Sequence, residues 1–389
     1  MRHLVFAAAL TIALAAVAPA PLGAQGAPVT ASFVVRLGID TVSVERVSRS
    51  ATRLEGELAT HSPRTVLRRY AADIGPNGAV TRFEVSSHTP GAADDAPPLQ
   101  RAVATVVGDS IRVEVQGVST QTTTVAAAAG TVMLVGGAYG PHELAIARAR
   151  QARQDSVAVP TYSVGGRAAS TLTVRRNGRD SIVMSTGMSA YRVRVDREGR
   201  ILGLHAPGTT QQIQLERTQS VDVTAIAAAW AARDAQGQAM GTFSPRDTVR
   251  ATAGGASLLV DYGRPRKRGR EIFGNVVAWG QVWRTGANAA TQFRTDRDLV
   301  LGTLTVPAGM YTLWTLPTPA GWQLIVNRQT GQWGTAYDAA QDLGRVPLSV
   351  ATLAEPVEVF TIAVEPQGSG GVLSFTWDRT RATIPFTVR

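Results

Sequence analysis

Alternation of apolar and polar residues is the dominant pattern of the chain from about residue 29 onward. In Asp40–Glu45 the apolar side chains are Val42 and Val44, and the segment 109–115 follows the same period. A period of two indicates strands with one buried and one wetted face. Turn signals rich in Gly, Asn and Asp separate such segments at 75–78, 176–179 and 196–199. Residues 29–219 therefore predict an antiparallel meander.

Two helical segments interrupt this region. Residues 141–157 carry Leu144, Ala145 and Ala149 at helical spacing, and Asp222 can cap a run over 223–235. A long antiparallel sheet needs its apolar face covered. Either these helices cover it, or the sheet curves and leaves an apolar groove for a ligand.

The remaining chain is denser in strand patterns. Nine short candidates lie in about 145 residues: 257–262, 291–295, 303–306, 310–316, 322–327, 346–350, 357–364, 372–377 and 383–388. This density favours a β-sandwich or a jelly roll. The predicted fold is mainly β. An antiparallel curved meander sheet with one or two helices covers 26–240, and a β-sandwich or jelly-roll-like domain covers 243–389.

Composition supports this division into two domains and excludes several kinds of catalytic and metal site. Six of the seven Trp follow Ser244 and all five His precede it, while 235–242 is a small, polar stretch suited to a boundary. The 389 residues fit two domains, and 44% hydrophobic residues suffice for ordinary cores. The absence of Cys excludes disulfides, thiolate nucleophiles and cysteine-based metal sites.

The net charge of +10 comes almost entirely from arginine. Lys267 is the only lysine, so arginine supplies 38 of the 39 basic residues. Most of these arginines are scattered beside acidic residues on strand-like segments, and no nucleic-acid recognition motif accompanies them. Nucleic acid is therefore not an expected partner.

The first 25 residues are typical of a secretory signal. Arg2 and His3 precede an apolar run over 4–17, and Ala18–Ala20 and Leu22–Ala24 offer cleavage sites between about residues 20 and 25. The alternative is an uncleaved anchor, although the run is short for a membrane span. We expect an exported protein of the periplasm or the extracellular space, with no transmembrane segment in the mature chain.

Known catalytic motifs are missing. His142–Ile146 begins like a zinc-protease helix but lacks the second His, and there is no G-x-S-x-G or P-loop sequence. The region after Ser244 has neither His nor Cys, so it cannot hold a Ser-His-Asp triad or a nitrogen/sulfur metal site of its own. No cofactor and no metal are predicted.

Two stretches of the second region could carry a site. Residues 264–270 hold five basic side chains, and they form either a solvated loop or a loop facing an anion. Residues 279–288 place Trp279 and Trp283 four apart, close to Arg284 and Asn288. They could form a platform for a sugar, or the Trp side chains could plug the end of the sandwich.

These stretches belong to a longer set of motifs. The strings at 261–265, 269–274, 282–288, 307–311, 332–334 and 355–358 resemble the bacterial domain of unknown function 2911 family over about residues 256–389. That resemblance implies exported proteins with no established activity. It supplies no catalytic residues.

Three functional hypotheses follow. The leading one is a non-catalytic envelope protein that binds a small molecule, a glycan or an envelope protein partner, with candidate ligand-binding residues Asp261, Tyr262, Arg264, Trp283, Arg284, Asn288, Asn327 and Trp333. The second is a hydrolase in which Asp261 works with Arg264, Arg284 or Tyr262. The third is a carrier of lipophilic cargo in the first region, whose meander is loosely similar to exported curved-sheet carriers.

Overall fold

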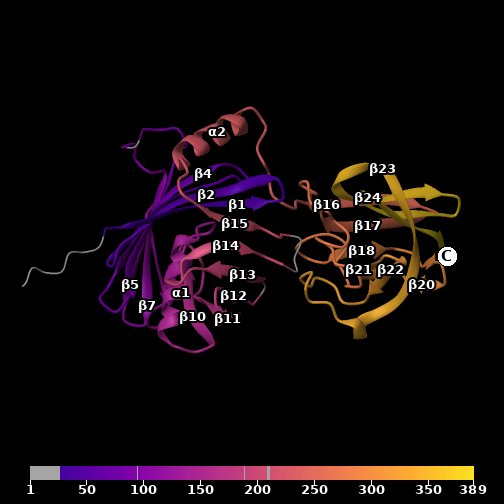
Figure 1. The fold of residues 1–389 in the computed structure, drawn as a ribbon. Helices are drawn as coiled ribbons and strands as arrows, with labels where there is room; N and C mark the ends of the chain where they lie inside the picture. Colours follow the sequence, from indigo (N-terminus) through magenta and orange to yellow (C-terminus); the bar gives the residue numbers. More distant parts are fainter. Residues whose placement is uncertain (1–26, 94, 188, 208–210) are drawn as a thin grey trace, which may run out of the picture.

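The computed structural model describes residues 27–93, 95–187, 189–207 and 211–389 (Figure 1). The predicted secretory signal lies outside these residues. Two large sheets make up most of the described chain, so the mainly β prediction is confirmed. No helix among the described residues is long and apolar enough to cross a membrane.

The first sheet is a long meander. Its spatial order is β8-β7-β6-β5-β4-β3-β2-β1-β15-β14-β13-β12-β11-β10-β9, with β9 and β10 parallel and the other neighbours antiparallel. In chain order its strands are β1 (Val29–Leu37), β2 (Asp40–Arg49), β3 (Arg53–Thr60), β4 (Val66–Ile74), β5 (Val80–His88), β6 (Gln100–Val107), β7 (Ser110–Gln116), β8 (Gln121–Ala126), β9 (Val132–Leu134), β10 (Ser156–Ser163), β11 (Ser170–Arg176), β12 (Ser181–Thr186), β13 (Ser189–Val195), β14 (Ile201–His205) and β15 (Gln214–Thr218).

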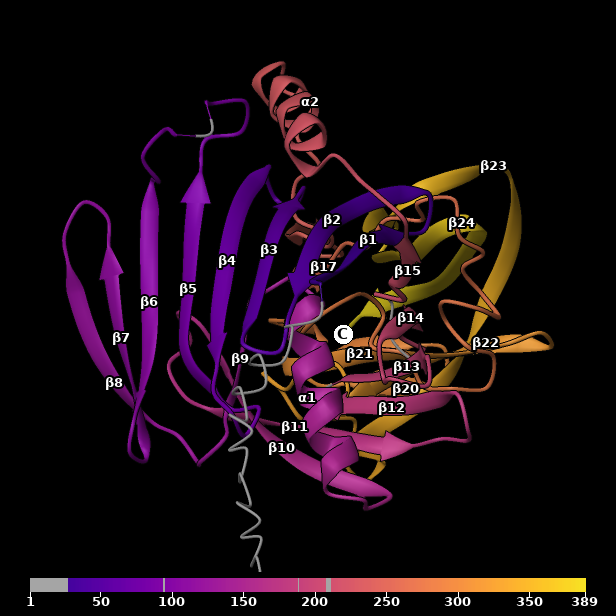
Figure 2. The same ribbon diagram turned by 60° about the vertical axis from the view of Figure 1, so that its left-hand side comes forward.

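The sheet curves around α1 (Gly140–Gln151), as Figure 2 shows. One apolar core joins Phe83 of β5 and Phe33 of the central strand β1 to Met184 of β12, and it includes Leu144 and Ile146 of α1. The sequence left open whether helices cover the apolar face or the sheet curves, and the structure shows both in part. The sheet is curved, and α1 covers much of its inner face.

A strand residue holds the start of α1. Tyr139, at the N-cap position, makes no capping hydrogen bond with its side chain. Instead, the Glu45 carboxylate of β2 accepts hydrogen bonds from the backbone N–H groups of Tyr139 (2.6 Å) and Gly140 (3.0 Å) and from the Tyr70 hydroxyl. It thereby satisfies donors that a helix start leaves open. Glu45 is fully buried, and this burial raises its pKa to about 7.

The prediction that this helix runs to residue 157 is wrong. The helix ends at Gln151, Arg153 has a positive φ of 53°, and Val157 already belongs to β10. Val157 pairs with Val174 of β11, so its place in the ladder outweighs the helical spacing of the preceding alanines.

The helix α2 (Val223–Ala235) lies on the opposite, outer face of the sheet. Asp222 caps it as predicted, because its carboxylate accepts a hydrogen bond from the Ala225 N–H at 2.9 Å. Ala227 and Trp230 pack on Val44 and Leu67 of the sheet. The boundary predicted at 235–242 falls between α2 and the first strand of the second sheet.

The second sheet is continuous and folds over itself. Its order is β16-β17-β18-β21-β22-β23-β24-β19-β20. The elements are β16 (Arg246–Ala253), β17 (Ala256–Gly263), β18 (Thr291–Thr295), β19 (Leu299–Leu301), β20 (Leu304–Val306), β21 (Gly309–Thr318), β22 (Gly321–Asn327), the 3-10 helix η1 (Ala339–Gln341), β23 (Asp342–Gln367) and β24 (Gly370–Val388).

Two long strands replace the four short ones expected near the C-terminal end of the sequence. β23 pairs with β22 through its first residues and with β24 through the rest, so it passes from one layer to the other. The pattern breaks near Glu355 and Trp377 mark bends within strands, not turns between them. β16 and β19 were not among the expected strands.

The two sheets meet at the basic loop 264–270. The Arg268 carbonyl accepts a hydrogen bond from the Ile39 N–H (3.0 Å), and its guanidinium forms an ion pair with Asp40. A Cβ at Gly38 would overlap the Arg268 carbonyl, so the β1–β2 turn fits closely against this loop. The alternative of a fully solvated loop is therefore wrong for Arg268, which is 6% exposed.

The buried Glu45 carboxyl leads to a pH-dependent prediction. Its pKa of about 7 lies above the ordinary value of 4.5. Its protonated form thus contributes stability that is complete below about pH 4.5 and is lost as the pH rises through 7. We expect the unfolding free energy of the wild type, minus that of Glu45→Gln, to fall between pH 5 and pH 8 in denaturant titrations.

The difference in unfolding free energy between the wild type and Glu45→Gln is compared because it removes the pH dependence that other groups contribute to both proteins. Burial lowers the pKa of His142 to about 4, which gives a slope of the opposite sign between about pH 4 and 6.5 in both proteins. A flat difference for Glu45→Gln would show that this carboxyl does not change its ionisation on folding.

Candidate functional site

Three of the predicted ligand-binding residues lie in the interior of the second sheet. Trp283 is 7% exposed, and its ring lies 5.0 Å from that of Phe360 and 5.9 Å from that of Trp377. Tyr262 is also buried, and its hydroxyl accepts a hydrogen bond from the Ile362 N–H at 3.1 Å. In the described structure these two aromatic side chains support the core.

Asn327 is buried at the end of β22. Its side-chain N–H groups donate to the Asp338 carbonyl (2.8 Å) and the Asp342 carboxylate (2.9 Å). Its side-chain oxygen accepts from the Gln329 N–H at 3.0 Å. With its hydrogen bonds used in this way, Asn327 holds the loop that leads into β23.

Asp261 and Arg264 form separate ion pairs with β16. Asp261 pairs with Arg246 at 2.9 Å, and Arg264 pairs with Asp247 at 2.9 Å. Tyr262 is next to Asp261 on the same strand and therefore points to the opposite face. The structure does not bring Asp261 together with Tyr262 and Arg264 in the way that the hydrolase hypothesis requires.

Arg284, Asn288 and Trp333 do come together. The Arg284 guanidinium donates to the Gly334 carbonyl at 3.1 Å, and the Gly334 N–H donates to the Asn288 carbonyl at 3.0 Å. Burial lowers the pKa of Arg284. Trp333 forms a bridge with Ala289 and is 47% exposed. Of the two Trp side chains of the predicted sugar platform, Trp283 is buried and Trp279 is 40% exposed, so they do not present one open face to a sugar.

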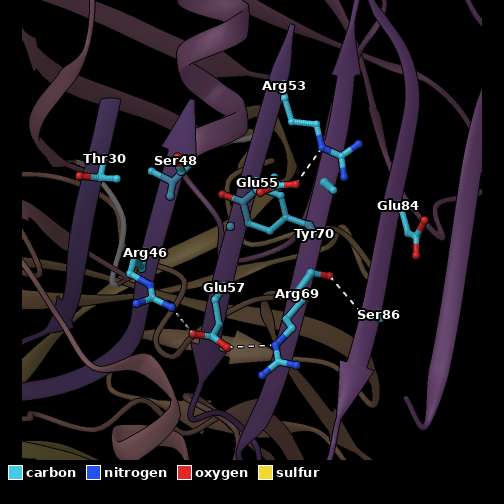
Figure 3. A pocket seen from close by; sticks show the side chains of 13 residues that line it. Thr30, Arg46, Ser48, Arg53, Glu55, Glu57, Arg69, Tyr70, Glu84 and Ser86 are labelled. Carbon is cyan, nitrogen blue, oxygen red and sulfur yellow. Dashed lines mark hydrogen bonds and ion pairs between the residues drawn. The ribbon is translucent and has the colours of Figure 1, made fainter. Parts of the chain in front are cut away.

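A hollow of about 560 Å³ lies on the outer face of the first sheet (Figure 3). Glu57 bridges two neighbouring strands there, since it pairs with Arg46 at 3.3 Å and with Arg69 at 3.1 Å. Glu84 pairs with Arg101 and Arg82, and these contacts lower its pKa. The charges of this surface largely neutralise one another, which makes it a poor site for a strongly charged ligand.

The inner face holds a hollow of different character, of about 720 Å³, beside the C-terminal half of α1. We call it the basic pocket. Its apolar floor comes from α1, β11, β12 and β13 and consists of Ile146, Ala149, Val174, Ile182 and Val195. Arginines from α1 and from the β11–β12 turn line its rim: Arg150, Arg153, Arg176 and Arg179.

The rim of the basic pocket has an excess of positive charge. Asp155 is the single acidic residue in the lining. Arg150 donates to the Arg197 carbonyl at 2.5 Å, whereas no other described residue forms a side-chain hydrogen bond or ion pair with Arg153, Arg176 or Arg179. Three guanidinium groups are therefore available to a ligand.

Another hollow, of about 440 Å³, lies beside α1 on the side that faces β1 and β2. Ala31 and Val47 line it together with Arg49, whose pKa is lowered by burial. Glu143 also lines it and is already paired with Arg217 at 3.1 Å. Hollows that combine apolar side chains with arginine thus lie on both flanks of the helix.

Comparison with known proteins identifies one part of the chain. Residues 244–386 match the family described as Protein of unknown function (DUF2911). The resemblance read from the motifs at 256–389 is confirmed, and the match also includes β16. No curated protein matches the chain.

Solved structures give only distant likenesses. A β-barrel-like protein of domain of unknown function DUF1849 from Brucella abortus aligns with 51% of this chain and 100% of its own, at 10% identity and a TM-score of 0.34. Transferrin binding protein B from serogroup B Neisseria meningitidis aligns with 94% of this chain and 77% of its own, at 8% identity and a TM-score of 0.14.

The basic pocket lies outside the DUF2911 segment, and the sequence analysis did not predict it. The sequence of 176–179 predicts only a turn. One signal was available: Arg176 shares the inward parity of Leu172 and Val174, so a charged side chain continues an apolar strand face. What no local pattern indicates is that α1 brings Arg150 and Arg153 to the same place.

The interior position of Trp283 predicts a structural role in the DUF2911 segment. We expect Trp283→Ala to lower the unfolding free energy by about 3–5 kcal/mol, because it empties the centre of an aromatic core. Trp333→Ala removes the same side chain from an exposed position and should cost less than about 1 kcal/mol. Chemical denaturation followed by far-UV circular dichroism measures both; equal losses would contradict the assignment.

Proposed function

We propose that this protein is a non-catalytic binding protein and that its ligand is an amphiphile with an anionic head group, held in the basic pocket. The observation that carries the proposal is an apolar floor beneath a rim of four arginines and a single acid. This deepens the expectation of a lipophile carrier and moves the ligand site away from the residues after Asp261.

The rim suits a carboxylate or phosphate head group. A guanidinium presents paired N–H donors that match two oxygens of such a group, and these charge-assisted hydrogen bonds are stronger than neutral ones. Arg176 ends β11, Arg179 lies in the turn that leads to β12, and Arg153 follows the end of α1. Donors from separate elements can thus surround one head group.

The floor suits an apolar tail. Ile146, Val174 and Ile182 belong to the main apolar core, yet they also line the hollow. A hydrocarbon chain laid over them would remove its own apolar surface from water, worth about 0.8 kcal/mol for each buried CH₂ group. The combination of a charged rim and an apolar floor selects molecules that have both parts.

The side chains of the pocket favour binding over catalysis. Its lining, drawn entirely from described residues, contains no His or Lys that could act as a general base near neutral pH. Ser181 also lines it, and its hydroxyl is hydrogen-bonded to the Asn177 carbonyl. The charged donors around the hollow are arginines, which hold charge and do not transfer protons.

The proposal includes export. Residues 1–25 have the charge, apolar run and small-residue sites of a secretory signal. On expression in a Gram-negative host, we expect intact-mass measurement of the periplasmic protein to give a mature chain that starts after Ala20 or Ala24. A full-length chain found in the membrane fraction would contradict cleavage and indicate an anchor.

The ligand class is tested by a pair of neighbouring arginines. Arg175 and Arg176 follow each other on β11, and only Arg176 lines the basic pocket. We expect Arg176→Gln to weaken the binding of dodecanoate, followed by isothermal titration calorimetry, at least tenfold. Arg175→Gln removes the same charge from the outer face and should leave the affinity within about twofold.

Two further outcomes decide the proposal. Dodecanol has the same tail without the charge, and it should bind far more weakly than dodecanoate. Equal binding of the two molecules, or equal losses in Arg175→Gln and Arg176→Gln, would show that the rim does not select an anionic head group. Native mass spectrometry of the purified protein would in addition reveal any amphiphile retained from the host.

A further inference from the structure

A small hollow of about 230 Å³ lies between the two sheets and is separate from the basic pocket. We call it the seam pocket. Leu37 lines it from the first sheet, Phe243 and Ser244 from the connecting segment, and Arg266, Arg270 and Asn288 from the DUF2911 segment. It therefore touches all three parts of the chain that meet at the seam.

Positive charge is concentrated around the seam pocket. Arg266, Arg268 and Arg270 alternate along the basic loop, and the guanidinium of Arg270 donates to the carbonyls of Arg266 (2.7 Å) and Lys267 (3.0 Å). Burial, followed by the charge of Arg268, lowers the pKa of Arg270 to about 10. Arg266 is exposed, and no described carboxylate forms an ion pair with it.

The nearby acidic groups do not balance this charge. Asp40 pairs with one nitrogen of Arg268, while the Glu358 carboxylate accepts the Arg268 backbone N–H at 3.0 Å. Nε and the second terminal nitrogen of Arg268 are buried, and no described residue accepts their hydrogen bonds. The same guanidinium lies over the ring of Phe243, 5.6 Å from its centre. Unsatisfied buried donors of this kind are rare in native proteins.

Asn288 adds an uncharged donor. Its backbone has a positive φ of 64°, a conformation that Asn tolerates better than most residues, and its side chain is exposed. The side-chain N–H reaches the Ser244 carbonyl only at 3.4 Å, a long hydrogen bond that a better acceptor could replace.

We propose that the seam pocket binds a small oxyanion, a phosphate or a carboxylate group, between Arg266, Asn288 and the connecting segment at Ser244. The nearby positive charges of Arg268 and Arg270 add a favourable electrostatic interaction with the anion. These three groups lie at the end of the connecting segment and in the DUF2911 segment, beside the contact between the two sheets. This site does not depend on the amphiphile proposed above.

Calorimetric titration of the full chain with inorganic phosphate and with succinate, at constant ionic strength, tests the site. We expect at least one of them to bind with one-to-one stoichiometry and to raise the melting temperature. Arg266→Gln and Asn288→Gly should each weaken that binding at least fivefold. Glycine at 288 removes the amide and keeps the positive φ accessible.

The controls separate a built site from the general attraction of a basic protein for anions. Arg250→Gln removes an exposed charge of β16 and should leave the binding unchanged. Arg176→Gln reports separately on any binding of the anion in the basic pocket. An equal loss in Arg250→Gln, a loss in Arg176→Gln alone, or no binding of either anion would overturn the proposal.

Discussion

The hydrogen bonds of Glu45 with the start of α1 are the interaction on which the first sheet depends. They tie a central strand, β2, to the helix that fills the curve of the sheet, although the two are about ninety residues apart in sequence. A buried carboxyl costs free energy unless its oxygens are hydrogen-bonded, and here two backbone N–H groups and the Tyr70 hydroxyl serve it. The position of α1 then decides which parts of the inner face remain open. The basic pocket is one of these parts.

At the seam between the sheets a buried side chain again joins two parts of the structure, and here the side chain is positively charged. Arg268 is buried where the β1–β2 turn meets the basic loop, and the close approach of the two backbones is possible because Gly38 has no Cβ. A net charge of +10 first suggests a diffuse attraction for anions. In the structure part of that charge is built into a contact between sheets, and another part surrounds the basic pocket. Charge that is held in place can recognise a ligand, whereas scattered charge mainly affects solubility and long-range attraction.

Periodicity was a reliable guide to the strands and a poor one to where they begin and end. The alternation around Val42 and Val44 correctly indicates β2, and Asp222 correctly marks the start of α2. The C-terminal limit of α1 was missed because alanines continue the helical spacing while Val157 pairs in the sheet. Likewise, β23 appeared as two strands because a bend interrupts its pattern without ending its ladder. Both errors arise where a long-range pairing decides between two local patterns that are each acceptable.

The amino-acid sequence by itself determined the mainly β class, the covering helices and the family resemblance of the C-terminal part, because periodicity, capping and motif strings are local. It also singled out the basic loop and Asn288. Only the tertiary structure decided which candidates face solvent: it placed Trp283, Tyr262 and Asn327 in the interior and brought arginines of α1 and the β11–β12 turn to one hollow. The physical reason is that a strand pattern states which residues share a face. What covers that face depends on how the sheet curves, which is set by contacts between residues far apart in the chain.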